Sequence, residues 1–145
     1  MDVSYEPLDP IPFTERLLTL ALQLKQIGLP WVPHAGCFVW DHKGVVTAPS
    51  PFPRNVYFIL SMKRFLGIFG EAEQMQRQLV WLPTWYQAMQ LCQRLGIPAS
   101  QSDSKPSTGE ETLIALYRLM LKQLTAAGTA ENSDLLSAVQ EKDQA

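Results

Sequence analysis

The chain has 145 residues, a net charge of −2, a hydrophobic content of 46% and a charged content of 18%. These values are typical of a single globular domain, and the slight acidic balance argues against a general polyanion binder, which normally carries an excess of Lys and Arg. The N-terminus lacks the basic segment and apolar run of a signal peptide, and no apolar run approaches the ~18 residues of a membrane span. We therefore expect a cytoplasmic protein without membrane contact.

The two cysteines, Cys37 and Cys92, both lie among apolar residues. Nothing in the sequence signals export to an oxidising compartment, where disulfides form and persist. We therefore expect both cysteines to be free, buried thiols.

The N-terminal part of the chain predicts an extended arm followed by a helix. Residues 1–13 contain three prolines, which disfavour helix. Thr14 is a suitable N-cap for a helix that runs to Ile27, because apolar residues follow it at helical spacing. The segment Gly28-Leu29-Pro30 predicts its end, since glycine adopts a left-handed conformation, leucine supplies an apolar contact and proline cannot continue the helix.

The next segment predicts a β-hairpin and a third strand. Cys37–Trp40 is an apolar strand, residues 41–44 have the Asp and Gly of a type I turn, and Val45–Thr47 is the returning strand. The proline-rich connector over 49–53 must be non-helical, and Asn55–Leu60 predicts another strand.

Two helical segments and a central strand follow. Residues 62–69, capped by Ser61, have apolar residues at helical spacing, and residues 71–78 form a largely polar helical segment. Leu79–Leu82 is a continuous apolar run, which is typical of a strand buried on both faces. Pro83 ends this strand because it has no N–H for a ladder.

Thr84 predicts the N-cap of the next helix, and Gly96, Ile97 and Pro98 end that helix by the same device as the first. We expect its apolar stripe to face the core. The stripe consists of Trp85, Ala88, Met89, Cys92 and Leu95.

A linker separates this core from a last helix. Residues 99–109 are rich in Ser and contain Pro and Gly, which is typical of a linker. The capping box formed by Thr108 and Glu111 starts a helix over 110–128. The polar residues 129–145 predict a disordered tail.

These elements predict an α+β fold with a three- to four-stranded mixed sheet, helices packed mainly on one face, and a C-terminal helix after a flexible linker. Residues 1–98 form the core domain with its extended arm. The sequence leaves open whether the last helix packs in cis or against a second copy of the chain.

Three of these segments together resemble a class of small uncharacterised bacterial and prophage proteins. They are the amphipathic helix within Leu17–Trp31, the hairpin around an aromatic strand within Cys37–Val46, and the strand-Pro-Thr-helix element that begins at Trp81. The resemblance covers roughly half of the chain and its motifs are unspecific, and the segment 55–78 and the last helix depart from it. It implies a bacterial, cytoplasmic setting and no particular activity.

The segment 34–42 is the strongest candidate for a metal or thiol site, because it holds His34, Cys37, Asp41 and His42. These residue types bind first-row metals, and a Cys–His pair can act as a nucleophile. If Cys37–Trp40 is a strand, however, the first two residues lie roughly 10–13 Å from the last two, at ~3.3 Å per residue. One ion cannot then bind all four. We predict no metal and no cofactor, and keep a small-ligand or enzymatic thiol site here as an alternative hypothesis.

Signatures of catalysis are missing from the sequence. It has no phosphate-binding glycine loop, dinucleotide fingerprint or nucleophile elbow, so we predict no catalytic residue. A second alternative is binding of single-stranded nucleic acid, because Arg54, Lys63 and Arg64 lie near aromatic residues that could stack on bases. The negative net charge argues against it.

Aromatic residues near prolines suggest a surface for a protein partner. Trp31, Trp40 and Phe52 predict an exposed aromatic and proline-rich patch, and large apolar patches are uncommon on monomers. Tyr117 lies on the apolar face of the last helix, which its own domain or a second copy must bury. The leading hypothesis is a non-enzymatic protein–protein interaction module that includes self-association.

Overall fold

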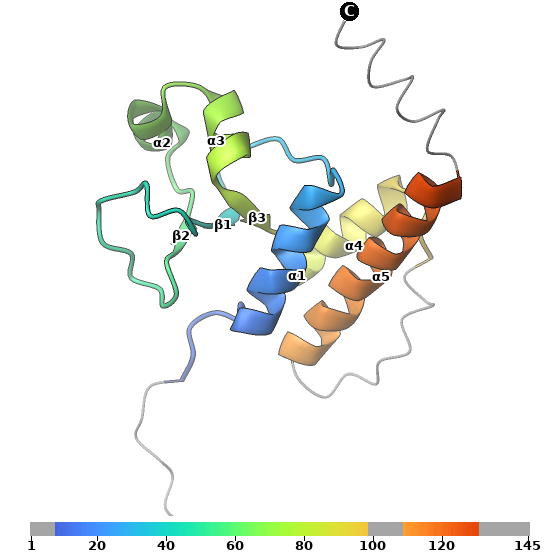
Figure 1. The fold of residues 1–145 in the computed structure, drawn as a ribbon. Coiled ribbons are helices and arrows are strands. Elements are labelled where there is room, and N and C mark those ends of the chain that lie inside the picture. The colour runs from blue at the N-terminus through green and yellow to red at the C-terminus, as the bar shows by residue number, and fades with distance from the viewer. Residues whose placement is uncertain (1–7, 99–108, 131–145) are drawn as a thin grey trace, which may run out of the picture.

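The computed structural model describes residues 8–98 and 109–130 (Figure 1). The predicted linker over 99–109 and tail over 129–145 fall almost wholly outside these ranges, as do the first seven residues of the N-terminal arm and Thr108 of the predicted capping box. The described residues form five helices and three strands, which confirms the predicted α+β class. In chain order they are α1 (Glu15–Gln26), β1 (Phe38–Trp40), β2 (Val56–Phe58), α2 (Met62–Phe69), α3 (Ala72–Gln78), β3 (Val80–Leu82), α4 (Trp85–Arg94) and α5 (Gly109–Ala130).

The sheet has the strand order β2-β1-β3, with β1 at its centre. Both pairings are antiparallel, so the sheet is not mixed as predicted. Val39 is in register with Tyr57 on one side and with Trp81 on the other. Because side chains alternate along a strand, these three residues share one face of the sheet.

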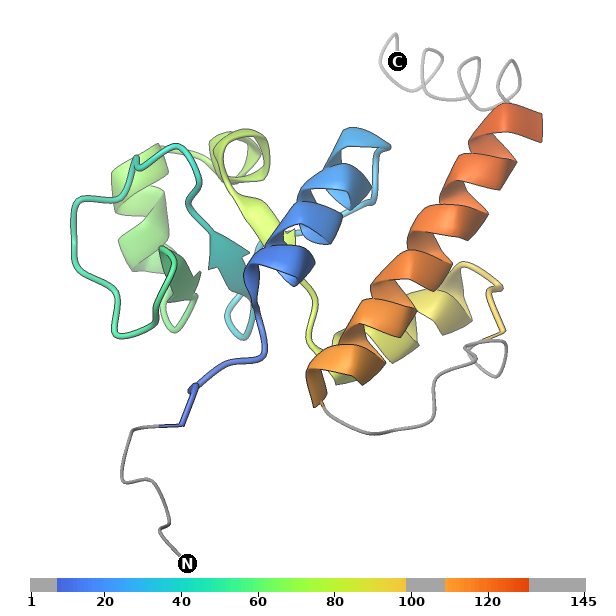
Figure 2. The same ribbon diagram turned by 60° about the horizontal axis from the view of Figure 1, so that its bottom comes forward.

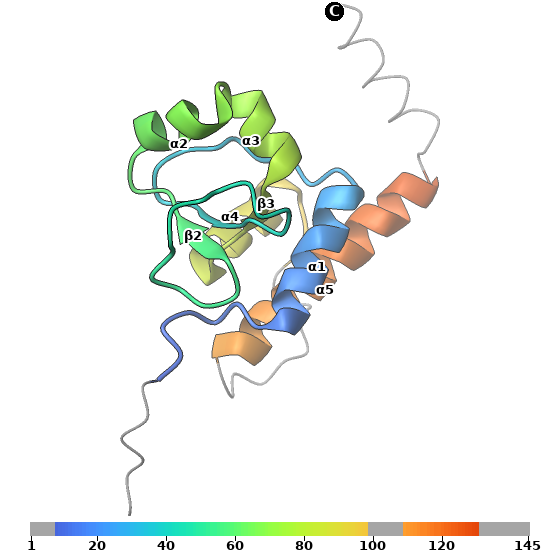
Figure 3. The same ribbon diagram turned by 60° about the vertical axis from the view of Figure 1, so that its left-hand side comes forward.

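Helices lie on both faces of the sheet rather than mainly on one. In Figures 2 and 3, α2 and α3 lie on one side of the strands and α1 on the other, with α1 between β3 and α5. Two buried clusters match these faces. The larger cluster joins buried residues of α1, α4 and α5 with Val56, Val80 and Leu82. The smaller cluster consists of Cys37, Val39, Val46, Ile59, Phe65, Phe69, Met75 and Leu79.

The predicted hairpin is wrong, because Val45–Thr47 is not a strand. The Asp41 carboxylate accepts the backbone N–H of Val45 at 3.0 Å and that of Val46 at 2.8 Å. These are donors that a returning strand would need for its ladder with β1. Asp41 is also buried, at 1% exposure. The chain therefore continues as a long loop, and β2 takes the place beside β1.

The predicted helix ends are confirmed where the structure describes them. Gly28 has a φ of 93° and Gly96 a φ of 69°, and the residue after each donates its N–H to a carbonyl five residues back in the helix. Thr84 accepts the backbone N–H of Gln87, while the Gln87 side chain accepts that of Thr84. This reciprocal capping box fixes the start of α4 directly after β3.

The apolar stripe of α4 differs from the predicted one. Its buried residues are Ala88, Leu91 and Cys92, and Trp85 is 50% exposed. The buried face shares Ala88 and Cys92 with the predicted stripe but is turned towards Leu91, so that the first residue of the helix falls at its edge. Trp85 therefore belongs to the surface, together with its neighbour Tyr86, which is 67% exposed.

The last helix packs in cis, which answers the question that the sequence leaves open. α5 lies along α1 and contacts α4 (Figure 1). Tyr117 is fully buried, and its hydroxyl donates to the carbonyl of Pro83 between β3 and α4. At the start of α5, Thr14 donates to a Glu110 carboxylate oxygen at 2.9 Å. The face of α5 that the sequence offered to a partner is thus covered by its own chain.

Substituting Tyr117→Phe is expected to lower the free energy of unfolding by about 1–3 kcal/mol, because the buried Pro83 carbonyl loses its donor while the ring still fills its place. Tyr86→Phe is the matched control, since it removes an exposed hydroxyl and should change stability by less than about 0.5 kcal/mol. Urea unfolding of both variants measures the difference. Equal stability of the two variants would show that the Tyr117 hydroxyl does not hold α5 in place.

Candidate functional site

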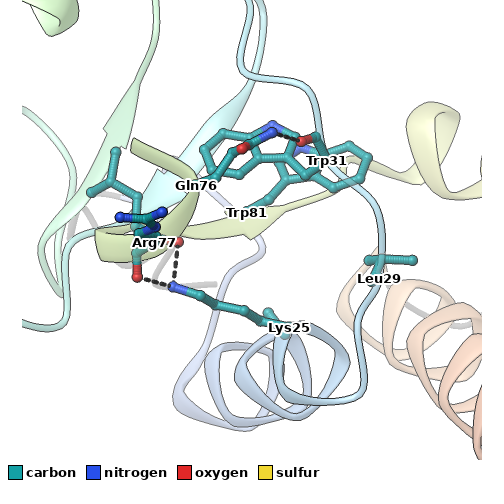
Figure 4. A pocket seen from close by; sticks show the side chains of 8 residues that line it. Lys25, Leu29, Trp31, Gln76, Arg77 and Trp81 are labelled. Atoms are coloured by element: carbon teal, nitrogen blue, oxygen red, sulfur yellow. Dashed lines mark hydrogen bonds between the residues drawn. The ribbon is translucent and has the colours of Figure 1, made fainter. Parts of the chain in front are cut away.

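A hollow of about 460 Å³ lies between α1, the loop after it, α3 and β3 (Figure 4). We call it the Lys25 hollow. Its walls come from two stretches that are far apart in the sequence, residues 21–31 of α1 and the loop after it, and residues 76–81 of α3 and β3. They consist of Ala21, Lys25, Leu29, Trp31, Gln76, Arg77, Leu79 and Trp81.

Two stacked tryptophans form one wall of the Lys25 hollow. The ring centroids of Trp31 and Trp81 are 6.3 Å apart and the ring planes differ by 10°. Trp81 is fixed by its place in β3, and the Gln76 side chain donates to the Trp31 carbonyl at 2.6 Å. The stack therefore joins the loop after α1 to both β3 and α3.

The indole N–H groups of Trp31 and Trp81 are both buried and have no hydrogen-bond partner among the described residues. Leaving a buried donor without a partner costs about 1–3 kcal/mol. Two such donors in one aromatic stack are an unusual concentration of unmet hydrogen-bonding capacity. No group in the described part of the fold uses these two donors.

Lys25 closes another side of the hollow and ties α1 to α3. Its Nζ donates to the carbonyl of Arg77 at 2.6 Å and to that of Leu79 at 3.0 Å, as Figure 4 shows. These carbonyls lie at the C-terminal end of α3, where a positive charge is favoured. Burial lowers the pKa of Lys25, and the positive charge of Lys43 lowers it further.

A second hollow, of about 410 Å³, also uses both tryptophans. We call it the Arg94 hollow. Its other lining residues come from the loop after α1 and from the last turn of α4 and its end. They are Pro30, Val32, His34, Leu91, Arg94 and Leu95. The tryptophan pair thus borders both hollows.

The four residues of the predicted metal or thiol site divide into two pairs. His34 Nε2 lies 3.5 Å from the Cys37 sulfur, so these two are neighbours at the start of β1. Asp41 binds its own loop, and His42 lies against the ring of Trp40 with centroids 5.1 Å apart. Within residues 8–98 and 109–130, no three His, Cys, Asp or Glu side chains converge as a metal site requires.

The four predicted partner-binding residues do not form one patch. Trp31 stacks on Trp81 at the hollows, whereas Trp40 and Phe52 are half-buried against the larger cluster. Tyr117 is enclosed by its own domain. The large apolar side chains that are exposed are Leu8, Ile27, Val32, Phe58, Leu60, Ile68, Trp85, Tyr86 and Leu95. Of these, Val32 and Leu95 line the Arg94 hollow together with Trp31.

The three predicted nucleic-acid contacts differ in their surroundings. Arg54 pairs with Asp9 at 3.1 Å and donates to the carbonyl of Phe13, so it holds the N-terminal arm on the body of the protein. Lys63 and Arg64 are exposed on α2. Arg54 is thus engaged by the N-terminal arm, whereas Lys63 and Arg64 are open to solvent.

Sequence reasoning missed most of the Lys25 hollow. Lys25, Leu29 and Gln76 carry no motif, and Arg77 looked like one of several surface cations. One available signal was the surplus of tryptophan, since two of the four line the hollow. The other was Lys25 itself, a cation at the last turn of an otherwise apolar helix face.

Comparison of the chain with protein-family models, with curated proteins and with solved structures gives no match. The resemblance to small bacterial and prophage proteins therefore remains an expectation. None of the helices within the described residues is long and apolar enough to span a membrane.

Both cysteines are free and buried, as predicted, and burial raises the pKa of the Cys92 thiol. We expect iodoacetamide at neutral pH to label Cys37 and Cys92 in the folded protein roughly a hundredfold or more slowly than in urea, because a core thiol reacts only through local opening. Mass spectrometry of timed samples measures both rates. Fast labelling of Cys37 in the folded chain would instead restore the thiol-site hypothesis, with His34 as its base.

Proposed function

We propose that this chain is a small-molecule-binding protein whose binding site is the Lys25 hollow. The observation that carries the proposal is the pair of stacked indoles, with two buried and unpartnered N–H groups, that forms a wall of this hollow. A wall of this kind is suited to a flat apolar ligand that also accepts a hydrogen bond.

The size and lining of the hollow support this proposal. Ligand sites in proteins usually measure ≈ 300–1,000 Å³ and combine mainly apolar walls with a few polar groups that fix orientation. The Lys25 hollow, at about 460 Å³, lies in that range. Ala21, Leu29 and Leu79 supply apolar walls, and Lys25 and Gln76 supply donors that backbone contacts hold in place.

The unpartnered indole donors favour a ligand with an acceptor group. In the structure both N–H groups are shielded from solvent, so a ligand reaches them only if a ring tilts. Such a tilt exchanges an unmet hydrogen bond for a formed one, which is worth about 1–3 kcal/mol. Binding and a small movement of the stack are therefore coupled in this proposal.

Protein–protein contact, the leading hypothesis from the sequence, has less support. Its four residues lie in different places, and the last helix is already covered in cis. The thiol site at Cys37 has a neighbouring histidine, but the sulfur is fully buried. The Lys25 hollow requires only the small tilt of the tryptophan stack described above, whereas a ligand of Cys37 would have to enter the core.

Substituting Leu29→Trp is expected to weaken binding of the neutral fluorophore N-phenyl-1-naphthylamine by roughly tenfold or more, which is about 1.4 kcal/mol. Leu29 lines the hollow and is half-buried, so an indole at this position fills part of the space. Titration of the full-length protein, followed by the rise in fluorophore emission, gives the dissociation constants.

Ile27→Trp is the matched control for this experiment. Ile27 lies two residues away at the end of α1, is 41% exposed and does not line the hollow. It should leave the affinity within about twofold of the parent, since it alters only the surface. No binding to the parent protein, or equal binding to both variants, would contradict the proposal.

A further inference from the structure

We propose that the ligand of the Lys25 hollow is an anion, in which a flat apolar body carries a carboxylate, sulfonate or phosphate group. This inference rests on the proposed function and names the ligand class of the same site. The charges that line and surround the hollow carry it.

The charged residues that line the hollow are both cations. Lys25 and Arg77 belong to its walls, and none of its eight lining residues is Asp or Glu. The ion pair that the structure does contain, between Arg54 and Asp9, involves neither of them. Among the described residues, the hollow thus has two positive charges in its walls and no carboxylate in its lining, and Glu73 lies four positions before Arg77 on α3.

Further positive charge lies around Lys25. Lys43 is near enough to lower the pKa of Lys25, after the larger effect of burial. The pKa of His42 is also lowered, mainly by burial and then by the positive charges of Lys25 and Lys43. The Asp41 carboxylate has the opposite effect and raises this pKa. Asp41 is occupied by the N–H groups of its loop. An anion placed here would stabilise the ammonium group of Lys25 and relieve the repulsion from Lys43.

The contacts of Lys25 leave it able to bind an anion. An ammonium group has three N–H donors, and the carbonyls of Arg77 and Leu79 use two of them. The C-terminal end of a helix carries only about half an elementary negative charge, so the positive charge of Lys25 is not cancelled. The two hydrogen bonds hold the Nζ atom at the edge of the hollow, where Figure 4 places it.

The two parts of the ligand follow from the two walls. The near-parallel rings of Trp31 and Trp81 match an aromatic or otherwise flat body. Lys25 and Arg77 match the charged group, through charge-assisted hydrogen bonds that are roughly twice as strong as neutral ones. A cationic ligand of the same shape would be repelled by these residues, and a neutral ligand would leave them unused.

Two fluorophores of similar shape test this inference on the full-length protein. 8-Anilinonaphthalene-1-sulfonate carries one negative charge, and N-phenyl-1-naphthylamine is its uncharged counterpart. We expect the sulfonate to bind roughly tenfold more tightly at low salt. This preference should shrink as salt is added, because the screening length falls from ≈ 30 Å at 0.01 M to ≈ 8 Å at 0.15 M ionic strength.

Removing either cation should abolish the preference. We expect Arg77→Gln to weaken binding of the sulfonate by roughly fivefold or more and to change binding of the neutral fluorophore by less than about twofold. Arg77→Gln keeps the backbone carbonyl that accepts from Lys25, so we expect this variant to fold. Lys25→Met would remove that hydrogen bond and could loosen α3, which is why Arg77→Gln is the variant used. Arg94→Gln, the same change at the other hollow, is the control and should keep the preference.

The outcomes separate this inference from the proposed function. Equal or weaker binding of the sulfonate, or a preference that Arg77→Gln leaves intact, overturns the anion inference while binding of the neutral fluorophore upholds the site. The anion inference is also overturned if Arg94→Gln, and not Arg77→Gln, removes the preference for the sulfonate, because the ligand then occupies the Arg94 hollow. If Leu29→Trp blocks neither fluorophore, or neither binds the parent, both proposals fail.

Discussion

The indole of Trp81 packs against both hydrophobic clusters of the protein, and the arrangement of the other elements depends on this position. Trp81 lies on β3, in register with the central strand, and shares the face of the sheet that α2 and α3 cover. On the other face, α1 separates the sheet from α5. The loop after α1 brings Trp31 back onto Trp81, so this stacking contact helps to join the two sides of the molecule.

Both hollows lie beside the Trp31–Trp81 stack, between the larger and the smaller hydrophobic cluster. Lys25 spans the gap from α1 to the end of α3 and meets backbone carbonyls instead of apolar side chains. A half-buried cation and two buried indole donors without partners are costly features in a structural joint, since an apolar contact would serve that purpose better. Their presence is easier to understand as the requirement of a binding site than as a requirement of folding.

Local chemistry decides how much of this could be predicted from the sequence. Gly28, Gly96 and Thr84 mark helix ends through contacts within a few residues, and these predictions are confirmed. The prediction of a returning strand was wrong because the Asp41 carboxylate accepts the N–H groups of Val45 and Val46, a contact that the periodicity of the residues does not reveal. The sequence did not predict the Lys25 hollow for a related reason. Lys25 and the Arg77 carbonyl are 52 positions apart, and they meet because α1 packs against β3, which directly follows α3.

The central claim is that a ligand binds against the Trp31–Trp81 stack. The most direct test records the indole N–H resonances of the four tryptophans in the ¹⁵N-labelled, full-length protein, assigned through single Trp→Phe variants, while N-phenyl-1-naphthylamine is added. The structure predicts that the Trp31 and Trp81 signals shift together as the site fills, because their buried N–H groups gain a new environment, and that the signal of Trp85, exposed on α4, stays in place. A shift confined to Trp85 or Trp40, with Trp31 and Trp81 unchanged at saturation, would contradict the account.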